Sequence, residues 1–384
     1  MSRTIQIYIL AAISFLIGTA EYAIAGILDY ISTDLKISVA AAGQFITIFS
    51  IAFGIGTPLI ITFTSQLNRK NLLLYATLVF ALSNIAIAFF SSYLMINIFR
   101  AISGLSAGVL EVVCLTIAAA ISPPEKKGSA IATIVMGFSI ALVAGVPLGR
   151  LLLKYIDWEI IYLVIGLLSF LLFFIISKNI SKIDNNEKGL PLSQQFKFFK
   201  NPLIATTFLI TLFWINAYSI IYSYISPFLL DVSKMTDSNI SLILFFCGIS
   251  SIFGSKIGGF LTDKYGSQLT LFLGLTLQSL MLLSISFFNI SLFLIFLLLI
   301  IWTLSAWSSG PALQFNLIKL APLSTSIMFS LYASILQLGM ALGAMLGGIV
   351  IQKSNIEYIP WVAESSILIA ILLMSIFYIK KDKV

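Results

Sequence analysis

Long apolar stretches alternate with short polar gaps along the whole chain. A helix needs about 20 apolar residues to cross the roughly 30 Å of hydrocarbon in a bilayer. Twelve stretches are long enough, at residues 5–28, 40–64, 71–91, 94–120, 129–153, 159–177, 203–229, 239–262, 269–288, 291–318, 325–351 and 358–379. The alternation typical of a membrane barrel is missing, and lipid cannot satisfy open strand edges. We therefore expect an all-α polytopic membrane protein with twelve transmembrane helices.

The polar gaps divide these stretches into two equal sets. The widest gap runs from Ser177 to Asn201 and carries five lysines. Several residues recur 198 positions apart, among them Gly56 with Gly254 and Gly145 with Gly343. This offset indicates duplicated units. We predict two six-helix bundles, an N-terminal one at residues 1–177 and a C-terminal one at 203–384, joined by a cytoplasmic linker at 178–202.

Composition and charge support a membrane protein and fix its expected orientation. The chain is 59% hydrophobic and 10% charged, against roughly 45–50% and about 25% in a soluble domain. Lipid bilayer is therefore its solvent. On alternate sides of the predicted spans there are 15 and 5 basic residues, and the positive-inside rule places both termini and the linker in the cytoplasm. The net charge of +7 thus reflects orientation, and we expect no nucleic-acid partner.

Several kinds of chemistry are not expected in this chain. It has no histidine, and its two cysteines, Cys114 and Cys247, lie inside apolar stretches. A metal site, a cofactor site or a disulfide framework is therefore not predicted. An integral-membrane enzyme would need a clustered nucleophile or cofactor constellation, and a sensor would need an output domain. The sequence offers neither, so we expect a protein that is not an enzyme.

Five ionisable residues lie inside the predicted spans, namely Glu21, Arg100, Glu111, Lys256 and Glu364. Each costs at least about 2.5–3.5 kcal/mol at the bilayer centre unless it faces a cavity or a partner. Arg100 and Glu111 are eleven residues apart, close to three helical turns, and so share one helix face. Glu21 and Arg100 both fall in the outer half of the membrane and can pair. Lys256 and Glu364 lie near span ends and favour structural roles.

A buried carboxyl group close to an arginine can exchange its proton as a cavity opens to one side or the other. Glu21 and Glu111 are the candidates for such proton coupling, with Arg100 tuning Glu21. The alternative is a static ion pair that orders the helices.

Polar and aromatic residues in the spans provide candidate contacts for a cargo molecule. Tyr22, Asn216, Tyr222, Trp307 and Gln337 combine aromatic surface with hydrogen-bonding groups. Aromatic rings and amides suit a flat ligand that forms hydrogen bonds. The alternative is that these aromatic residues only pack helices or anchor them at the membrane interface.

Four segments together resemble the drug-proton antiporter branch of the major facilitator superfamily. Within that branch the chain is similar to bacterial purine base and nucleoside efflux pumps and to sugar efflux pumps. The segments are Gly145-Val146-Pro147-Leu148-Gly149, residues 222–229 (YSYISPFL), residues 307–314 (WSSGPALQ) and residues 336–343 (LQLGMALG). The resemblance implies rocking of two six-helix halves, a bacterial inner-membrane location and a proton-coupling role for Glu21. Glu111 departs from the purine pumps, which are apolar there, and suits a cationic or zwitterionic cargo.

Two of the matching regions are expected to control conformation. In the fifth span, Gly145, Pro147 and Gly149 allow close helix packing and a bend, although generic small-residue packing is an alternative.

The loop after the eighth span, with Gly259, Asp263 and Gly266, resembles the cytoplasmic signature of major facilitators. There the Asp latches one conformation, whereas an ordinary charged turn is the alternative. The first-half equivalent departs from the signature, with Ser65 and Asn68 in place of Asp and Gly.

The expected function is proton-driven export of a small organic molecule by alternating access, with protons as the second partner and a monomer as the working unit. A purine- or sugar-like metabolite is the favoured cargo. An amphiphilic or cationic drug and a secreted metal-chelating metabolite are alternatives, as is uptake by the same fold.

Overall fold

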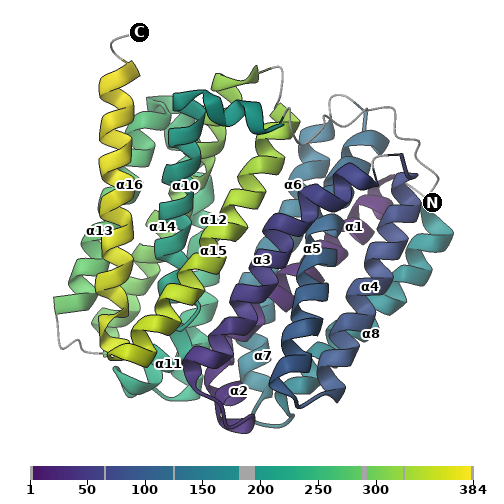
Figure 1. Cartoon of the computed structure of the whole chain (residues 1–384), viewed down its shortest axis with the longest axis horizontal. Coiled ribbons are helices and arrows are strands. Elements are labelled where there is room, and N and C mark those ends of the chain that lie inside the picture. Colours follow the sequence, from purple (N-terminus) through teal and green to yellow (C-terminus); the bar gives the residue numbers. More distant parts are fainter. Residues whose placement is uncertain are drawn as a thin grey trace.

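The computed structural model of the chain is a bundle of long helices (Figure 1). It describes residues 3–64, 66–123, 126–180, 195–287, 292–322 and 325–381, and every regular element among them is helical. Within these ranges, twelve helices are long and apolar enough to cross a membrane. The expected all-α, twelve-span class is therefore confirmed.

The first six spans are α1 (Arg3–Gly26), α3 (Val39–Phe63), α4 (Arg69–Phe89), α5 (Tyr93–Ile121), α6 (Lys127–Ile140) with its continuation η2 (Ala141–Gly145) and α7 (Val146–Leu152), and α8 (Trp158–Asn179). The last six are α10 (Pro202–Tyr222), α12 (Asp237–Tyr265), α13 (Ser267–Phe287), α14 (Leu292–Leu320), α15 (Thr325–Lys353) and α16 (Ile359–Lys381).

Two of the predicted spans end earlier than their apolar stretches. The first ends at Gly26 and is followed by the short helix α2 (Leu28–Asp34), and the seventh ends at Tyr222 before α11 (Ile225–Asp231). In the second case Pro227 removes a backbone donor that a continuous helix would need across the break. Hydropathy does not register such breaks because the residues on both sides are apolar.

The helix boundaries reveal an internal repeat. Helix α13 begins and ends 198 residues after α4 begins and ends. The loops after α2 and α11 repeat as well, since Lys36 (φ 53°) and Lys234 (φ 51°) both adopt the left-handed conformation and are 198 residues apart. Such a φ is uncommon outside glycine. The shared exception supports the duplication inferred from the glycine spacing.

The two sets of six spans pack largely within themselves and meet along a seam. Helix α3 runs beside α15 in the middle of Figure 1, and α12 packs against η2 and α7. The described chain begins and ends in the upper part of Figure 1, which is called the terminal side here, and α2, α7 and α11 lie at the other, distal side. The exact limits of the two bundles stay a prediction. Most of the expected linker, residues 181–194, falls outside the described residues, which resume at Gln195 before the short helix η3 (Phe196–Lys200).

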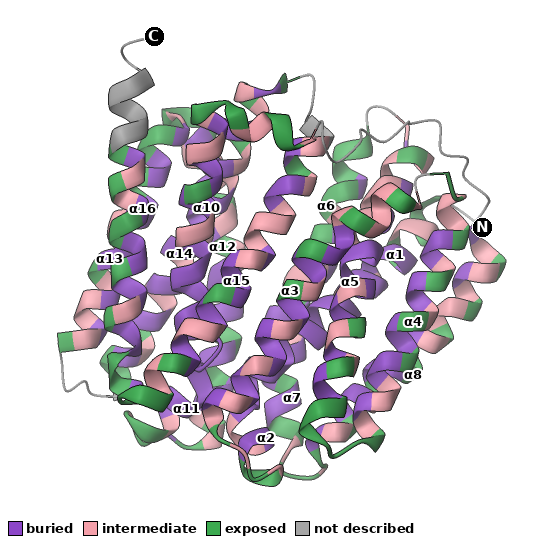
Figure 2. Cartoon of the chain, viewed as in Figure 1, coloured by how far each residue is buried: buried purple, intermediate pink, exposed green. Residues whose placement is uncertain are grey.

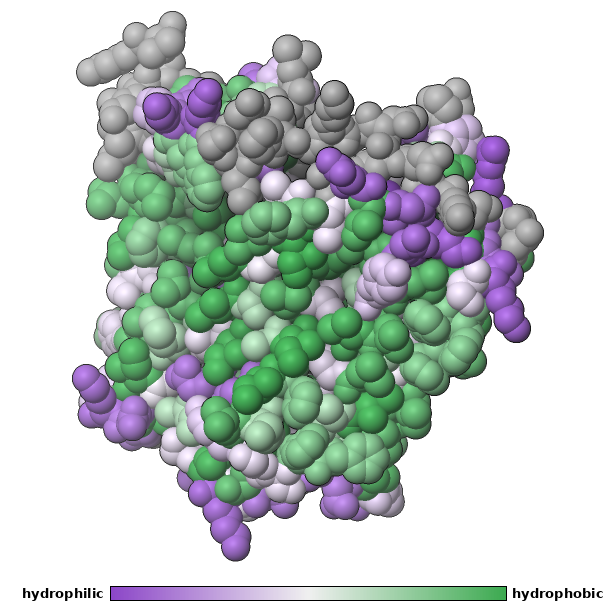
Figure 3. All heavy atoms as spheres, turned by 45° about the vertical axis from the view of Figure 1, so that its right-hand side comes forward, coloured by the Kyte–Doolittle hydropathy of each residue, from purple (hydrophilic) through white to green (hydrophobic). Residues whose placement is uncertain are grey.

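The outer surface of the bundle is apolar. Figure 2 shows exposed and intermediate residues on the outer faces of the spans, and Figure 3 shows a hydrophobic band between hydrophilic ends. Many of the exposed residues are large and apolar, such as Leu94, Leu171 and Leu372. So broad an exposed apolar surface belongs in contact with lipid. Polar side chains are instead concentrated in the interior and at the two ends.

Close backbone contacts between helices depend on glycine at particular positions. A Cβ on Gly258 would lie 2.1 Å from the carbonyl oxygen of Ser308, whereas a Cβ on neighbouring Gly259 would meet nothing within 4 Å. Gly258 therefore lets α12 and α14 touch, and Gly259 does not serve this contact.

We expect Gly258→Ala to lower the free energy of unfolding by about 1–3 kcal/mol, because its methyl group would push two backbones apart. Gly259→Ala is the matched control and should change stability by less than about 0.5 kcal/mol. Thermal unfolding of the purified variants in detergent measures both. Equal melting temperatures for the two variants would contradict this account of the α12–α14 contact.

Candidate transport site and distal gate

Glu21 lies on the helix that is most enclosed by the rest of the protein. Helix α1 is buried almost continuously from Ile9 to Gly26, and the Glu21 side chain is 2% exposed. A carboxyl group placed so deeply is shielded from lipid by neighbouring helices. Its environment is therefore made by protein groups.

The partner of Glu21 comes from the other half of the molecule. Nε2 of Gln337, on α15, donates a hydrogen bond of 3.0 Å to Oε1 of Glu21, and both side chains are buried. Oε2 of Glu21 and Oε1 of Gln337 have no hydrogen-bond partner in the described structure. Two acceptor oxygen atoms at the seam therefore have no hydrogen bond in the described structure.

Arg100 does not form the ion pair with Glu21 that the sequence suggested. This fully buried side chain donates instead to the carbonyl oxygens of Ala20 (2.8 Å) and Phe45 (3.1 Å). Its guanidinium group lies over the ring of Phe49, 4.3 Å from the ring centre. These N–H groups of Arg100 therefore donate to backbone carbonyl oxygens and not to the Glu21 carboxylate. Arg100 therefore ties α5 to α1 and α3 next to Glu21.

Glu111 is half-buried and lies on the interior face of α5. Glu111 is eleven residues from Arg100, close to three helical turns, so it lies on the same face of α5 as this fully buried residue. Its carboxyl group has no hydrogen-bond or ion-pair partner among the described residues. A partly exposed, unpaired carboxylate on an interior face is available to solvent or to a charged ligand.

Aromatic rings from both halves meet beside Glu21. The rings of Tyr22 and Tyr222 contact each other edge to face across the seam, with centres 5.8 Å apart. Tyr218 connects this pair to two tryptophans: it stacks on Tyr222 (5.2 Å) and on Trp302 (5.0 Å) and meets Trp307 edge to face (6.0 Å). We call Glu21, Tyr22, Tyr218, Tyr222, Trp307 and Gln337 the central cluster. Tyr218 lies one turn before Tyr222 on α10 and completes the cluster.

Asn216 lies away from the central cluster. Its side-chain oxygen accepts a hydrogen bond of 2.9 Å from Ser366 on α16. Residues two apart on a helix point in different directions, so Asn216 cannot share the face of Tyr218 and Tyr222. In this structure it joins α10 to α16.

Glu364 is likewise enclosed in the second half. It is 3% exposed, and its Oε1 accepts a hydrogen bond of 2.6 Å from Ser279 on α13. This contact joins α13 to α16, in keeping with the expected structural role of Glu364.

The Gly-Pro segment of the fifth span departs from a regular α-helix. Pro147 has no backbone donor, and the preceding residues Ala141–Gly145 form a π-helical turn, a rare departure from the regular α-helix. A Cβ on Gly145 would lie 2.6 Å from Oγ1 of Thr19 on α1, whereas one on Gly149 would meet nothing closer than 3.6 Å. The segment is therefore pressed against α1 at Gly145 and less closely packed at Gly149.

Two of the predicted signature residues, Asp263 and Gly266, lie at the end of α12. Gly266 has a φ of 89° and ends α12, a conformation that glycine adopts without strain. Asp263 is exposed and has no ion-pair partner among the described residues. A latch through Asp263 stays a prediction.

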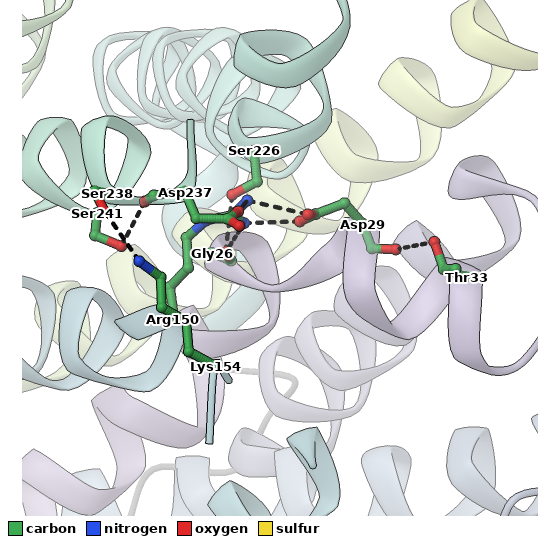
Figure 4. Close-up of polar contacts among 9 residues, drawn as sticks. All are labelled: Gly26, Asp29, Thr33, Arg150, Lys154, Ser226, Asp237, Ser238 and Ser241. Carbon is green, nitrogen blue, oxygen red and sulfur yellow. Dashed lines mark hydrogen bonds and ion pairs between the residues drawn. The ribbon is translucent and has the colours of Figure 1, made fainter. Parts of the chain in front are cut away.

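The sequence analysis missed a charged cluster that joins the halves at the distal side, drawn in Figure 4. Arg150 directly follows the Gly-Pro segment and is fully buried. It binds both carboxylate oxygens of Asp29 (2.8 and 3.0 Å) in its own half and Oδ1 of Asp237 (2.8 Å) in the other half. The bidentate pairing with Asp29 fixes the plane of the guanidinium group. We call Gly26, Asp29, Arg150, Ser226 and Asp237 the distal gate.

The end of α1 supplies the remaining acceptor of the distal gate. The last carbonyl groups of a helix lack an intrahelical partner. The carbonyl oxygen of Gly26 accepts from Arg150 (2.6 Å) and from the Ser226 hydroxyl of the other half (2.9 Å). Burial, together with a hydrogen bond to Asp237, raises the pKa of the neighbouring Tyr30 phenol. Its hydroxyl thus stays a donor at neutral pH.

Two similar six-helix sets, an enclosed polar and aromatic cluster at their seam and a charged closure on one side define a secondary membrane transporter. The chain belongs to the Major Facilitator Superfamily, whose family model matches residues 10–332. It is therefore a major facilitator transporter, as the four segments suggested.

Known relatives agree with this assignment. The chain is 39% identical over 383 residues to the "Uncharacterized MFS-type transporter YbcL" of Bacillus subtilis (strain 168), covering 100% of this chain and 98% of the relative. It is 26% identical over 378 residues to a "Probable sugar efflux transporter" of Helicobacter pylori (strain P12), covering 98% and 96%. Among solved structures it is similar to a bacterial homolog of the human lysosomal transporter Spinster in an inward-facing, unoccupied conformation. The TM-score is 0.80 at 16% identity, with 98% and 96% of the chains covered, a likeness of fold.

Removing one charge from the distal gate should loosen it. In Asp237→Asn, Arg150 keeps Asp29 but loses its ion pair with the other half. Because the Asp237 side chain is 36% exposed, the expected effect is about 1 kcal/mol, or roughly a fivefold shift toward distally separated halves. Distances between spin labels at positions 36 and 234, measured with Cys114 and Cys247 replaced by alanine, report this separation.

Asp231→Asn is the matched control, since Asp231 is an exposed carboxylate at the distal end of the same half. It should leave the distance distribution unchanged. A distribution in Asp237→Asn that is identical to that of the control would show that the ion pair does not hold the halves together.

Proposed function

We propose that the protein is a proton-coupled exporter of small organic molecules that works by alternating access between its two halves. The hydrogen bond between Glu21 and Gln337 carries this proposal, because it joins a proton-binding carboxyl group of one half directly to a side chain of the other half. Any motion that separates the halves at this level must break it. Protonation of Glu21 and movement of the halves are therefore coupled.

The unused acceptors define which cargo the central cluster favours. A buried polar atom without a partner costs about 1–3 kcal/mol. A cargo with several N–H or O–H groups would satisfy Oε2 of Glu21 and Oε1 of Gln337, while the rings of Tyr22, Tyr222 and Trp307 offer flat apolar surface. A purine- or sugar-like metabolite has both properties. The printed name of the Helicobacter relative, a sugar efflux transporter, agrees in direction and in cargo class.

One observation favours a second cargo class. The carboxyl group of Glu111 is unpaired and partly exposed on the interior face of α5. A cationic or zwitterionic molecule would neutralise it, as an amphiphilic drug or an amine-bearing metabolite would. In that case Glu111 binds cargo in competition with protons.

The proposed transport cycle breaks and re-forms two contacts between the halves, the distal gate and the hydrogen bond between Glu21 and Gln337. In the structure the distal gate is closed through Arg150, and the central bond between Glu21 and Gln337 is formed. We place the terminal side in the cytoplasm of a bacterial inner membrane, in keeping with the 15 basic residues that the sequence predicts on one side of the spans against 5 on the other. Cargo then enters from the terminal side of a monomer. Opening of the distal gate releases it in exchange for a proton taken up on Glu21.

Proton release is the direct test of coupling. Adding the correct cargo to purified wild-type protein in detergent should release protons. Glu21→Gln should abolish this release while cargo binding survives, because the amide keeps the shape and cannot ionise. Glu111→Gln tests the second carboxyl group in the same way. Proton release is followed with a pH indicator in weakly buffered solution, and binding by calorimetry.

Glu364→Gln is the matched control, since Glu364 is a buried carboxyl group that contacts Ser279 outside the central cluster. It should release protons as the wild type does. Release that persists in the Glu21 and Glu111 variants alike would remove both residues from the coupling mechanism.

Cargo class and direction need a separate measurement in cells. A strain that lacks the protein should accumulate its cargo, so intracellular purine nucleosides, sugars and an added amphiphilic cation are compared with and without the gene. Accumulation of a nucleoside or sugar supports the favoured class, and accumulation of the cation supports the second. Lower intracellular levels in the deletion strain would indicate uptake.

A further inference from the structure

A separate apolar pocket lies in the seam between α3 and α15. It has a volume of about 200 Å³ and lies among Gly54, Ile55, Pro58 and Leu59 of α3, Leu331, Ser334, Ile335 and Leu338 of α15, and Gln195, Phe196 and Phe199 at η3. We call it the seam pocket. None of its residues belongs to the central cluster or to the distal gate.

The seam pocket begins where the two helices stop touching. At Gly54 they are so close that an added Cβ would lie 3.0 Å from the carbonyl oxygen of Ser334. Helix α3 continues from there toward the terminal side through Leu59, and α15 arrives from that side through Leu331. Phe196 and Phe199 close the space at its terminal end, where η3 lies across the bundle (Figure 1). The pocket is thus a wedge between the two halves.

Its size and lining exclude the cargo proposed above. Pockets for drug-sized ligands measure roughly 300–1,000 Å³ and contain a few well-placed polar groups. The seam pocket is smaller, and its lining side chains are apolar apart from Ser334 and Gln195. Ile55 and Leu59 are also exposed. A slim hydrocarbon chain that enters from the bilayer fits these conditions.

The short helix η3 adds charge next to this apolar space. In a 3₁₀-helix, residues three apart lie above one another. Phe196 and Phe199 therefore form one stripe, which lines the pocket, and Lys197 and Lys200 form the next stripe. Both lysines are exposed, and each directly follows a lining phenylalanine in the chain. Phe199 is fixed against the bundle by its ring contact with Phe208 on α10, with centres 5.2 Å apart.

We propose that the seam pocket binds one acyl chain of an anionic phospholipid, whose phosphate group is held by Lys197 and Lys200. Apolar burial supplies the binding of the chain, and the two ammonium groups select an anionic headgroup. A chain in the wedge keeps α3 and α15 apart on the terminal side. The lipid thereby favours the conformation in which the distal gate is closed.

Lipid retention measured by native mass spectrometry tests this proposal independently of transport. Protein is purified in mild detergent with phosphatidylglycerol or with phosphatidylcholine, and the bound lipid is counted per chain. The wild type should retain one phosphatidylglycerol in preference to phosphatidylcholine. Retention should fall roughly fivefold for each of Lys197→Gln and Lys200→Gln. Lys353→Gln, which removes a lysine from the distal end of α15, is the charge control.

Filling the pocket tests the site of the acyl chain. Ile335→Trp places an indole ring in the wedge and should abolish retention, whereas Leu372→Trp adds the same ring to the lipid-facing surface of α16 and should not. Leu59→Trp fills the pocket from α3 if Ile335→Trp does not give folded protein. Equal binding of both lipids, or wild-type retention in a folded, filled variant, would overturn the proposal.

Discussion

Hydrocarbon offers no hydrogen bonds, so a chain that crosses it must satisfy its polar groups from within. For the backbone this requirement produces helices over nearly the whole described chain. For side chains it means that a carboxyl or guanidinium group is tolerated only where protein surrounds it. Glu21 and Arg100, on the enclosed surfaces of α1 and α5, meet this condition. The interior polar groups consequently lie where helices from different parts of the chain converge, and in this fold the two halves converge at the seam.

The same requirement explains why irregular backbone occurs next to the polar contacts. Where α1 ends at Gly26, a carbonyl group is freed, and two side chains from different parts of the molecule bind it. Where Pro147 removes a donor, a π-helical turn forms and carries Arg150 to the same place. Each departure from the regular helix would be unfavourable alone. At the distal gate the two departures compensate each other. The carbonyl oxygen that is freed at Gly26 accepts a hydrogen bond from Arg150, which the irregular segment carries to it.

The amount that could be predicted from sequence differs between the fold and the site. Hydropathy located the spans to within a few residues, because length and apolar character are properties of each segment alone. Breaks after Gly26 and Tyr222 were missed since apolar residues continue across them. Glu21 and Gln337 were anticipated because ionisable and amide groups are rare in such spans. Gly258 and Gly259 could not be told apart, since adjacent glycines differ only in which neighbour they face. The contact between Arg150 and Asp237 joins positions 87 residues apart, and no local pattern marks such a pair.

The internal repeat is not exact at the distal gate. The position 198 residues after Arg150 is Gly348, where an added Cβ would lie 2.6 Å from the hydroxyl oxygen of Tyr224. One half therefore contributes a cation, and the other keeps the matching place empty for an aromatic ring. The position 198 residues before Tyr224 is Gly26, whose carbonyl oxygen accepts the hydrogen bond from Arg150. At these two matched positions the first half thus holds glycine and arginine where the second holds tyrosine and glycine, so the halves contribute different and complementary parts.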